Sequence, residues 1–335
     1  MKKILFILIV LLCTSVASAQ SEIEILVRDG ISFHRTGNYE GAIEAYKKAL
    51  KIDDKSPLAN YELALTYMTT GEYNKAIKHS DIVIEQNGKY LIQAFTTKGS
   101  SLSSLNKTDE AIKVFIEAID LFGDNHLIYY NLGFVYFKTE EFNNAEIALT
   151  NAIITKPNHA SSHLLLAYTM HEKKQKVQSN LSLHYFLLLE PKSDRAKLAF
   201  QLLEKNLTGN VEKTNENTIN INILQSSIES EFGAAEMMIA MLEASNSLDE
   251  NMGKSEEELF IENTTSFFKV LGELKKEDNS GLWWNFYVPF FYEIANSEYI
   301  ETYCHYISVG SKEKSAGWIN ENPHKLDVFF SYLME

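Results

Sequence analysis

The amino-acid sequence predicts an all-α protein, in which a superhelical solenoid of helix pairs precedes a mainly helical C-terminal region. The first observation is a small residue that recurs at intervals of 34 or 35 positions: Gly30, Ala64, Gly99, Gly133 and Ala167. Two helices of about a dozen residues and two turns use roughly 34 residues. No single helix pair of this length can bury its apolar face, so successive pairs must stack.

The second observation is that each small residue is followed by others at fixed offsets. Twelve positions on comes a further small residue: Ala42, Ala76, Ala111, Ala145 and Ser179. Four positions beyond that comes a side chain that is large in four of five units: Tyr46, Ser80, Phe115, Leu149 and Leu183. We interpret the small residues as points where the two helices of a pair approach closely, and the large ones as the filling between pairs.

This pattern resembles the tetratricopeptide repeat family. The resemblance is closest over residues 23–90 and 126–159, where the second segment has these residues on the motif: Tyr129, Leu132, Gly133, Tyr136, Ala145 and Pro157. It implies a solenoid over residues 20–209, with five repeats near 23–56, 57–91, 92–125, 126–159 and 160–193 and a capping helix over 194–207. The fifth unit departs from the motif, because its inter-helix turn, Lys173 to Lys176, lacks a glycine.

In this family the first helices of the repeats line a concave groove that holds peptides or protein segments. The resemblance places the following side chains in that groove: Val27, Ile31, His34, Tyr61, Leu65, Met68, Tyr130, Phe134, Phe137, Leu164, Tyr168 and His171. The third repeat contributes only Thr96, Ser100 and Ser103. One subfamily clamps a C-terminal carboxylate with lysines and asparagines at such positions, but this chain has apolar or small residues there. Either a partner's segment or the chain's own C-terminal region can fill such an apolar wall.

Residues 1–19 have the pattern of a secretory signal peptide. Lys2 and Lys3 precede the apolar run Ile4 to Leu12, and Ala17 to Ala19 provide a small-residue cleavage site. We therefore expect an exported protein that is periplasmic, associated with the cell envelope, or secreted. The alternative is a lipoprotein anchored at Cys13. Cleavage after Ala19 leaves Cys304 alone and no internal disulfide, and no later segment is long enough to span a membrane.

Charge separates the two halves of the chain. The formal net charge is −14; residues 210–335 hold 8 basic and 22 acidic side chains, whereas residues 20–209 hold 21 and 23. A nucleic-acid-binding protein needs a basic surface, which this chain lacks. Attraction to anionic lipid is disfavoured for the same reason.

The region after the repeats resembles no family that we identify. Residues 210–222 are polar and predict a linker, followed by an acidic, aromatic-rich helical domain over 223–335 with helices near 223–245, 255–276 and from Pro323 onwards. Ten of the 27 residues from Gly281 to Ile307 are aromatic, which indicates either a core or a surface for a glycan, peptide or partner helix. Because Trp283 and Trp284 are adjacent, we expect one of them near the surface.

The sequence contains no phosphate loop, dinucleotide-binding glycine pattern, paired-cysteine motif or zinc-protease motif. We therefore expect no cofactor, no metal site and no catalytic residues. Packing and loop roles are favoured over three weaker alternatives: a metal pair at His159 and His163, a Cys304 nucleophile with a distant base such as His324, and a calcium loop, rather than a surface loop, starting at Asp249. The sequence thus favours a non-catalytic interaction scaffold for a protein or peptide. The alternative is a C-terminal enzyme or ligand-binding domain that the repeats position.

Overall fold

The computed structural model describes residues 20–207, 211–215, 218–221, 231–245 and 253–334. The predicted signal peptide and the start of the predicted surface loop at Asp249 lie outside these residues. The chain divides into two compact units, Met1–Thr139 and Glu140–Glu335, which we call the N-terminal and the C-terminal unit. This division falls inside the fourth predicted repeat, so the partition predicted from the sequence, with its boundaries at residues 209 and 223, stays a prediction.

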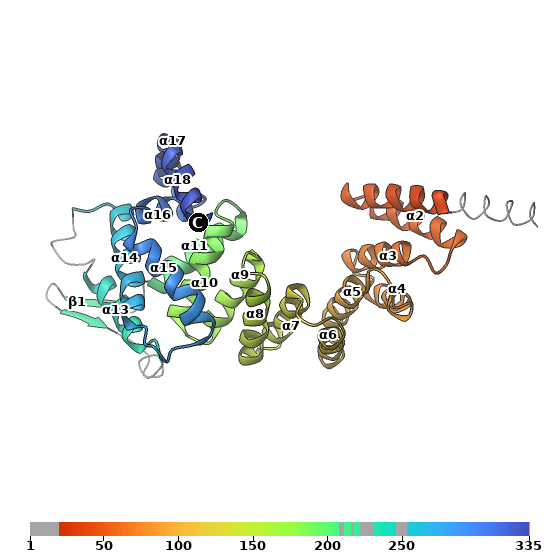
Figure 1. The fold of residues 1–335 in the computed structure, drawn as a ribbon, viewed down its shortest axis with the longest axis horizontal. Coiled ribbons are helices and arrows are strands. Elements are labelled where there is room, and N and C mark those ends of the chain that lie inside the picture. Colours follow the sequence, from red (N-terminus) through yellow and green to blue (C-terminus); the bar gives the residue numbers. More distant parts are fainter. Residues whose placement is uncertain (1–19, 208–210, 216–217, 222–230, 246–252, 335) are drawn as a thin grey trace, which may run out of the picture. The chain divides into compact units, whose positions relative to one another are not determined.

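The N-terminal unit consists of antiparallel helix pairs (Figure 1). A helix over residues 20–35 is followed by α2 (Tyr39–Ile52), α3 (Pro57–Thr69), α4 (Tyr73–Glu85), α5 (Leu91–Ser104), α6 (Thr108–Phe122) and α7 (His126–Lys138). The expected close approaches are present. A Cβ atom added at Gly30 would lie 2.4 Å from the Tyr46 ring, and one added at Gly99 would lie 2.4 Å from the Phe115 ring.

The turn inside each helix pair repeats with the same period as the sequence motif. A residue in the left-handed region occurs at Gly37, Gly71, Asn106, Glu140 and Lys174, with φ values between 58° and 79°. Glycine adopts this conformation without a steric penalty, whereas other residues are strained by it. The fifth unit therefore keeps the turn geometry of its predecessors even though Lys174 replaces glycine.

The C-terminal unit begins with four helices that continue the repeat. These are α8 (Phe142–Thr155), α9 (Ala160–Glu172), α10 (Lys176–Leu189) and α11 (Asp194–Leu207). After them come β1 (Val211–Asn215), β2 (Thr218–Ile221), α13 (Gly233–Ser245), α14 (Glu256–Leu274), the π-helical turn η2 (Trp283–Tyr287), α15 (Val288–Asn296), α16 (Ile300–Ser308), α17 (Glu313–Glu321) and α18 (Pro323–Met334). None of the helices in the described part of the chain is long and apolar enough to cross a membrane.

Two helix starts agree with the prediction. Ser255 forms a capping box at the start of α14: its hydroxyl accepts from the Glu258 amide at 3.2 Å, and its own amide donates to the Glu258 carboxylate at 2.8 Å. The final helix begins at Pro323, where the missing amide proton costs nothing.

Two strands form inside the segment predicted to be a linker. Strands β1 and β2 pair antiparallel, with Val211 opposite Ile221 and Lys213 opposite Ile219. β-branched residues such as Val211, Ile219 and Ile221 favour extended backbone, whereas the polar residues around them favour a loop. The segment over residues 210–222 therefore includes two paired strands, and its role as a linker between domains stays a prediction.

The prediction that Trp283 or Trp284 lies near the surface is also wrong, since their side chains are 7% and 2% exposed. Both lie in the π-helical turn η2, whose wider spacing changes the directions that an α-helix would give them. Trp284 stacks on Phe232 with ring centroids 4.6 Å apart. Each indole N–H reaches a carboxylate, Trp283 to Glu146 and Trp284 to Glu231.

Candidate functional site

The first helices of the N-terminal unit lie side by side. His34 Nδ1 lies 2.8 Å from the Thr66 hydroxyl, which links the helix over 20–35 to α3. Ser100 of α5 bonds to Asn131 of α7, and the Lys138 ammonium donates to the Ser103 carbonyl at 2.7 Å. We call the surface formed by the helix over 20–35, α3, α5 and α7 the first-helix face.

Most predicted groove residues of this unit have accessible surface on these helices. Phe134 is 43% exposed. The half-buried members are Ile31, His34, Tyr61, Leu65, Met68, Tyr130 and Phe137. Val27, at 1% exposed, belongs mainly to the core, although it and Ile31 line a pocket of about 370 Å³.

Aromatic side chains flank a polar section of the first-helix face. On one side, Tyr61 stacks on Tyr90 with ring centroids 5.6 Å apart and an interplanar angle of 7°. Burial raises the pKa of the Tyr61 phenol, which is therefore neutral at physiological pH. On the other side lies Phe134 of α7, and between them α5 presents the half-buried Thr96 and Ser100.

The predicted groove residues of the fifth repeat are placed differently. Leu164 is buried, and His171 Nδ1 lies 3.0 Å from the Asn206 amide oxygen of α11. Tyr168 is half-buried. Since Arg195 of α11 also donates to the Ser161 hydroxyl at 3.0 Å, the capping helix already contacts this part of the predicted groove.

The second helix of the fifth repeat, α10, is covered by the chain's own C-terminal region. It contacts α13, α16 and η2 as well as its neighbours in the repeat. His163 of α9 donates from Nε2 to the Pro157 carbonyl at 2.7 Å, so its Nδ1 accepts from the Tyr287 hydroxyl at 2.6 Å. His184 of α10 bonds to the Tyr303 hydroxyl at 3.0 Å.

A pocket of about 360 Å³ lies within the C-terminal unit, and we call it the C-terminal pocket. Its apolar lining comes from α11, α14 and α16: Phe200, Leu207, Leu259, Phe260, Ile261 and Cys304. Its polar lining is Glu204, Glu256, Glu257, Asn263, His305, Ser308, Lys312 and Ser315. Apolar walls with a few converging polar groups are typical of small-molecule sites.

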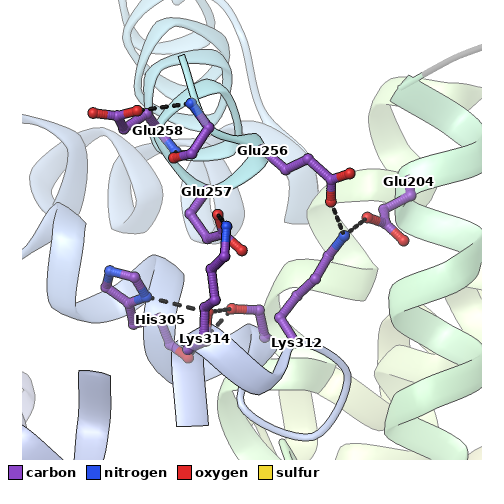
Figure 2. Close-up of polar contacts among 10 residues, drawn as sticks. Glu204, Glu256, Glu257, Glu258, His305, Lys312 and Lys314 are labelled. Atoms are coloured by element: carbon purple, nitrogen blue, oxygen red, sulfur yellow. Dashed lines mark hydrogen bonds and ion pairs between the residues drawn. The ribbon is translucent and has the colours of Figure 1, made fainter. Parts of the chain in front are cut away.

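Lys312 is the central charged group of the C-terminal pocket. Figure 2 shows it extended between Glu204 of α11 and Glu256 of α14, with N–O distances of 2.8 and 3.2 Å. Its ammonium also lies over the Phe200 ring, 5.9 Å from the centroid. Partial burial acts to lower the pKa of Lys312, but the hydrogen bonds to the two carboxylates outweigh it and raise that pKa. Lys314 pairs with Glu257 at 3.1 Å.

Cys304 and His305 both line this pocket, but they are not arranged as a nucleophile and its base. Cys304 is 1% exposed, and burial raises the pKa of its thiol well above the ordinary value. A nucleophilic cysteine needs the thiolate form, which this environment disfavours. His305 bonds to the Ser315 hydroxyl at 3.1 Å and stacks on Trp318. His324 lines a different pocket, beside Glu301 and Lys325.

The predicted alternative of a metal pair receives no support. Both ring nitrogens of His163 are engaged, and His159 Nδ1 lies 2.7 Å from the Ser162 hydroxyl. In the part of the chain that the structure describes, no three His, Cys, Asp or Glu side chains are grouped to hold a metal ion.

The C-terminal pocket could not be found by sequence reasoning. Its charged groups come from three separate elements, and in the sequence Glu256 and Glu257 indicate only the acidic first turn of a helix. The one available signal was the Cys304–His305 pair, which does mark the pocket wall.

Comparison with known proteins identifies the repeats. A TPR repeat model matches residues 30–71 and 99–140, and a tetratricopeptide repeat model matches residues 127–159. The helices of the N-terminal unit have the spacing, the turns and the close approaches that this motif requires. The chain therefore contains tetratricopeptide repeats, as its sequence predicts.

Among curated relatives, the TPR repeat-containing protein MJ1428 of Methanocaldococcus jannaschii is 27% identical over 48% of this chain and 30% of its own length. A probable UDP-N-acetylglucosamine–peptide N-acetylglucosaminyltransferase SPINDLY of Hordeum vulgare is 26% identical over 41% of this chain and 15% of its own. The chain thus spans less than a third of either relative.

Among solved structures, TTC0263 of Thermus thermophilus covers 55% of this chain and 98% of its own, at 18% identity and a TM-score of 0.47. PilF of Pseudomonas aeruginosa covers 56% of this chain and 85% of its own, at 20% identity and a TM-score of 0.49. These likenesses say nothing about function.

Proposed function

We propose that this protein is an exported, non-catalytic scaffold that binds a segment of another protein on its first-helix face. Tetratricopeptide repeats form a family of protein-interaction scaffolds, which supports the general class. The observation that carries the specific proposal is the exposed Phe134, which lies on α7 between the half-buried Tyr130 and Phe137. Exposed aromatic side chains supply much of the affinity where proteins bind one another.

The order of side chains across this face suggests the form of the bound segment. The first helices follow one another in the order α3, α5 and α7. Tyr61 of α3 and Tyr90, just before α5, therefore lie on one side of α5, and Phe134 of α7 lies on the other. The short side chains Thr96 and Ser100 leave room above α5. Their hydroxyls donate to the Ile92 carbonyl and to Asn131, so their oxygens remain as acceptors for a backbone amide. An extended segment with one apolar side chain against Tyr61 and another against Phe134 fits this arrangement.

Export is supported by the pattern of residues 1–19. We expect the mature chain to begin at Gln20. N-terminal sequencing of the protein from cell-envelope fractions checks this, and the lipoprotein alternative predicts instead a mature chain that starts at an acylated Cys13. A chain retaining Met1 would contradict both.

The double substitution Phe134→Ala/Phe137→Ala is expected to abolish capture of the partner from envelope extract, because it removes the aromatic surface at the end of α7. A loss of 2 kcal/mol or more, roughly thirtyfold in affinity, is typical of such positions. Quantitative mass spectrometry of the captured proteins measures the loss.

The matched control is Ile116→Ala/Leu121→Ala, which removes two exposed apolar side chains from α6, a second helix of the same unit. It is expected to retain the partner. If the Phe134/Phe137 variant keeps its native circular dichroism and every partner of the wild type, the first-helix face is not the binding surface.

A further inference from the structure

The C-terminal pocket contains a cation site made of three parts. The Glu204 and Glu256 carboxylates approach from α11 and α14, and the face of Phe200 lies beneath them. Two carboxylates and an aromatic face together are a favourable environment for an ammonium group. The protein's own Lys312 occupies this position, so its Nζ marks where such a group is held.

The rest of the pocket is apolar and is larger than the lysine head needs. Phe200 and Phe260 form an edge-to-face pair with centroids 5.4 Å apart, and Leu259 and Ile261 lie on the same wall. A volume of about 360 Å³ lies near the lower end of the range for small-molecule sites, about 300–1,000 Å³. One fused ring system with a short chain fits that size.

The charge of the lining selects the sign of the ligand. Of the three glutamates that line the pocket, Glu257 pairs with Lys314, whereas Glu204 and Glu256 share Lys312, the single lysine of the lining. Burial lowers the pKa of His305, so this ring is neutral at pH 7. Residues 210–335 add a surplus of 14 acidic over basic side chains, which raises the local concentration of cations.

We propose that the C-terminal pocket binds an organic ammonium compound, with its apolar body against Phe260, Leu259 and Ile261 and its ammonium between Glu204 and Glu256. The ligand displaces Lys312, which acts as an internal competitor. Lys312 is the N-cap residue of α17, on the connection from α16, and its side chain is 27% exposed, so that solvent can receive the displaced ammonium.

The proposal is tested with one cationic and one anionic probe, and with substitutions of Lys312 and Glu256 that are expected to change the affinity for the cation in opposite directions. The probes are 2-(1-naphthyl)ethylamine and 1-naphthylacetate, which share a ring and differ in charge, titrated into the purified full chain by isothermal calorimetry. We expect the amine to bind and the acid not to bind. Lys312→Ala should tighten amine binding about fivefold and Glu256→Gln should weaken it by a similar factor, as for one partly exposed ion pair.

Two control variants make the same kinds of charge change at positions outside the pocket. Lys325→Ala removes a lysine that pairs with Glu301, and Glu273→Gln removes an exposed carboxylate further along α14. Both are expected to leave the dissociation constant within twofold. Thermal melting of every variant confirms that the unit is folded, so that a change in affinity reports on the pocket.

A third probe, acetyl-Phe-Lys-amide, distinguishes a free amine from a lysine carried by a peptide, and the tighter of the two ammonium probes identifies the source. The proposal is overturned if neither ammonium probe binds, if the naphthylacetate binds more tightly than the amine, or if Lys312→Ala weakens amine binding. None of these measurements involves the first-helix face, so the proposed scaffold function stands or falls separately.

Discussion

Lowering the pH from 7 to 5 is expected to reduce the free energy of unfolding of the C-terminal unit by about 4 kcal/mol through two buried histidines. Burial lowers the pKa of His163 to about 4 and that of His184 to about 3. In the unfolded chain both have a pKa near 6.5. Between pH 6.5 and 4 the unfolded state therefore binds more protons than the folded state, and stability falls as the pH falls.

Burial explains why these histidines stay neutral. His163 donates to the Pro157 carbonyl, which can only accept, and its other nitrogen accepts from Tyr287. The bond to Pro157 by itself favours a protonated ring, but the loss of solvation on burial outweighs it and lowers the pKa of His163. His184 lies among the rings of Phe267, Phe268 and Phe291, where a charge has little solvation.

Urea denaturation at pH 7 and pH 5, followed by circular dichroism, measures this loss. The double variant His163→Gln/His184→Phe should lose about 4 kcal/mol less between the two pH values than the wild type, because glutamine can replace both hydrogen bonds and phenylalanine suits the aromatic surroundings. The control is His324→Gln, an exposed histidine of the same unit. Equal pH dependence in the wild type and the double variant would contradict the prediction.

Trp284→Ala is expected to destabilise the C-terminal unit by about 3–5 kcal/mol, the usual cost of truncating a fully buried large side chain. The substitution removes the stack on Phe232, whose ring planes are 7° from parallel, and the hydrogen bond at 2.9 Å to Glu231. These two contacts join η2 to the residues just before α13. The variant Trp284→Phe should recover most of the loss, because it keeps the stack and gives up only the hydrogen bond.

The free energies of unfolding from urea titrations test this ranking. Trp318→Ala serves as the matched control, since Trp318 also stacks on a ring, that of His305, but is only half-buried. Its expected cost is smaller than that of Trp284→Ala. Equal losses at the two positions would show that burial at η2 is not what stabilises the unit.

The repeat region was predictable from the sequence because its determinants are local. Small residues such as Gly30 and Gly99 leave the space that Tyr46 and Phe115 fill, and all four are separated by fixed offsets. The same locality made the helix start at Ser255 predictable. The turn at Lys174 was harder to predict, because lysine does not favour the left-handed backbone conformation that it adopts there.

The C-terminal region was not predictable in the same way. In an α-helix, two adjacent tryptophans point in different directions. No local sequence pattern predicts the π-helical turn in which both Trp283 and Trp284 are buried. Their hydrogen-bond partners are 137 and 53 residues away in the sequence. The C-terminal pocket has the same origin, since Glu204, Glu256 and Lys312 meet only after three distant elements have packed.

The two histidine–tyrosine pairs also limit how modular this repeat protein is. In an array of stacked units each repeat interacts only with its neighbours, so that one unit can in principle be exchanged for another. His163 and His184 instead bond to tyrosines 124 and 119 residues further along the chain. The fifth repeat is therefore not interchangeable: a generic unit in its place would keep the solenoid and lose the docking surface of everything that follows.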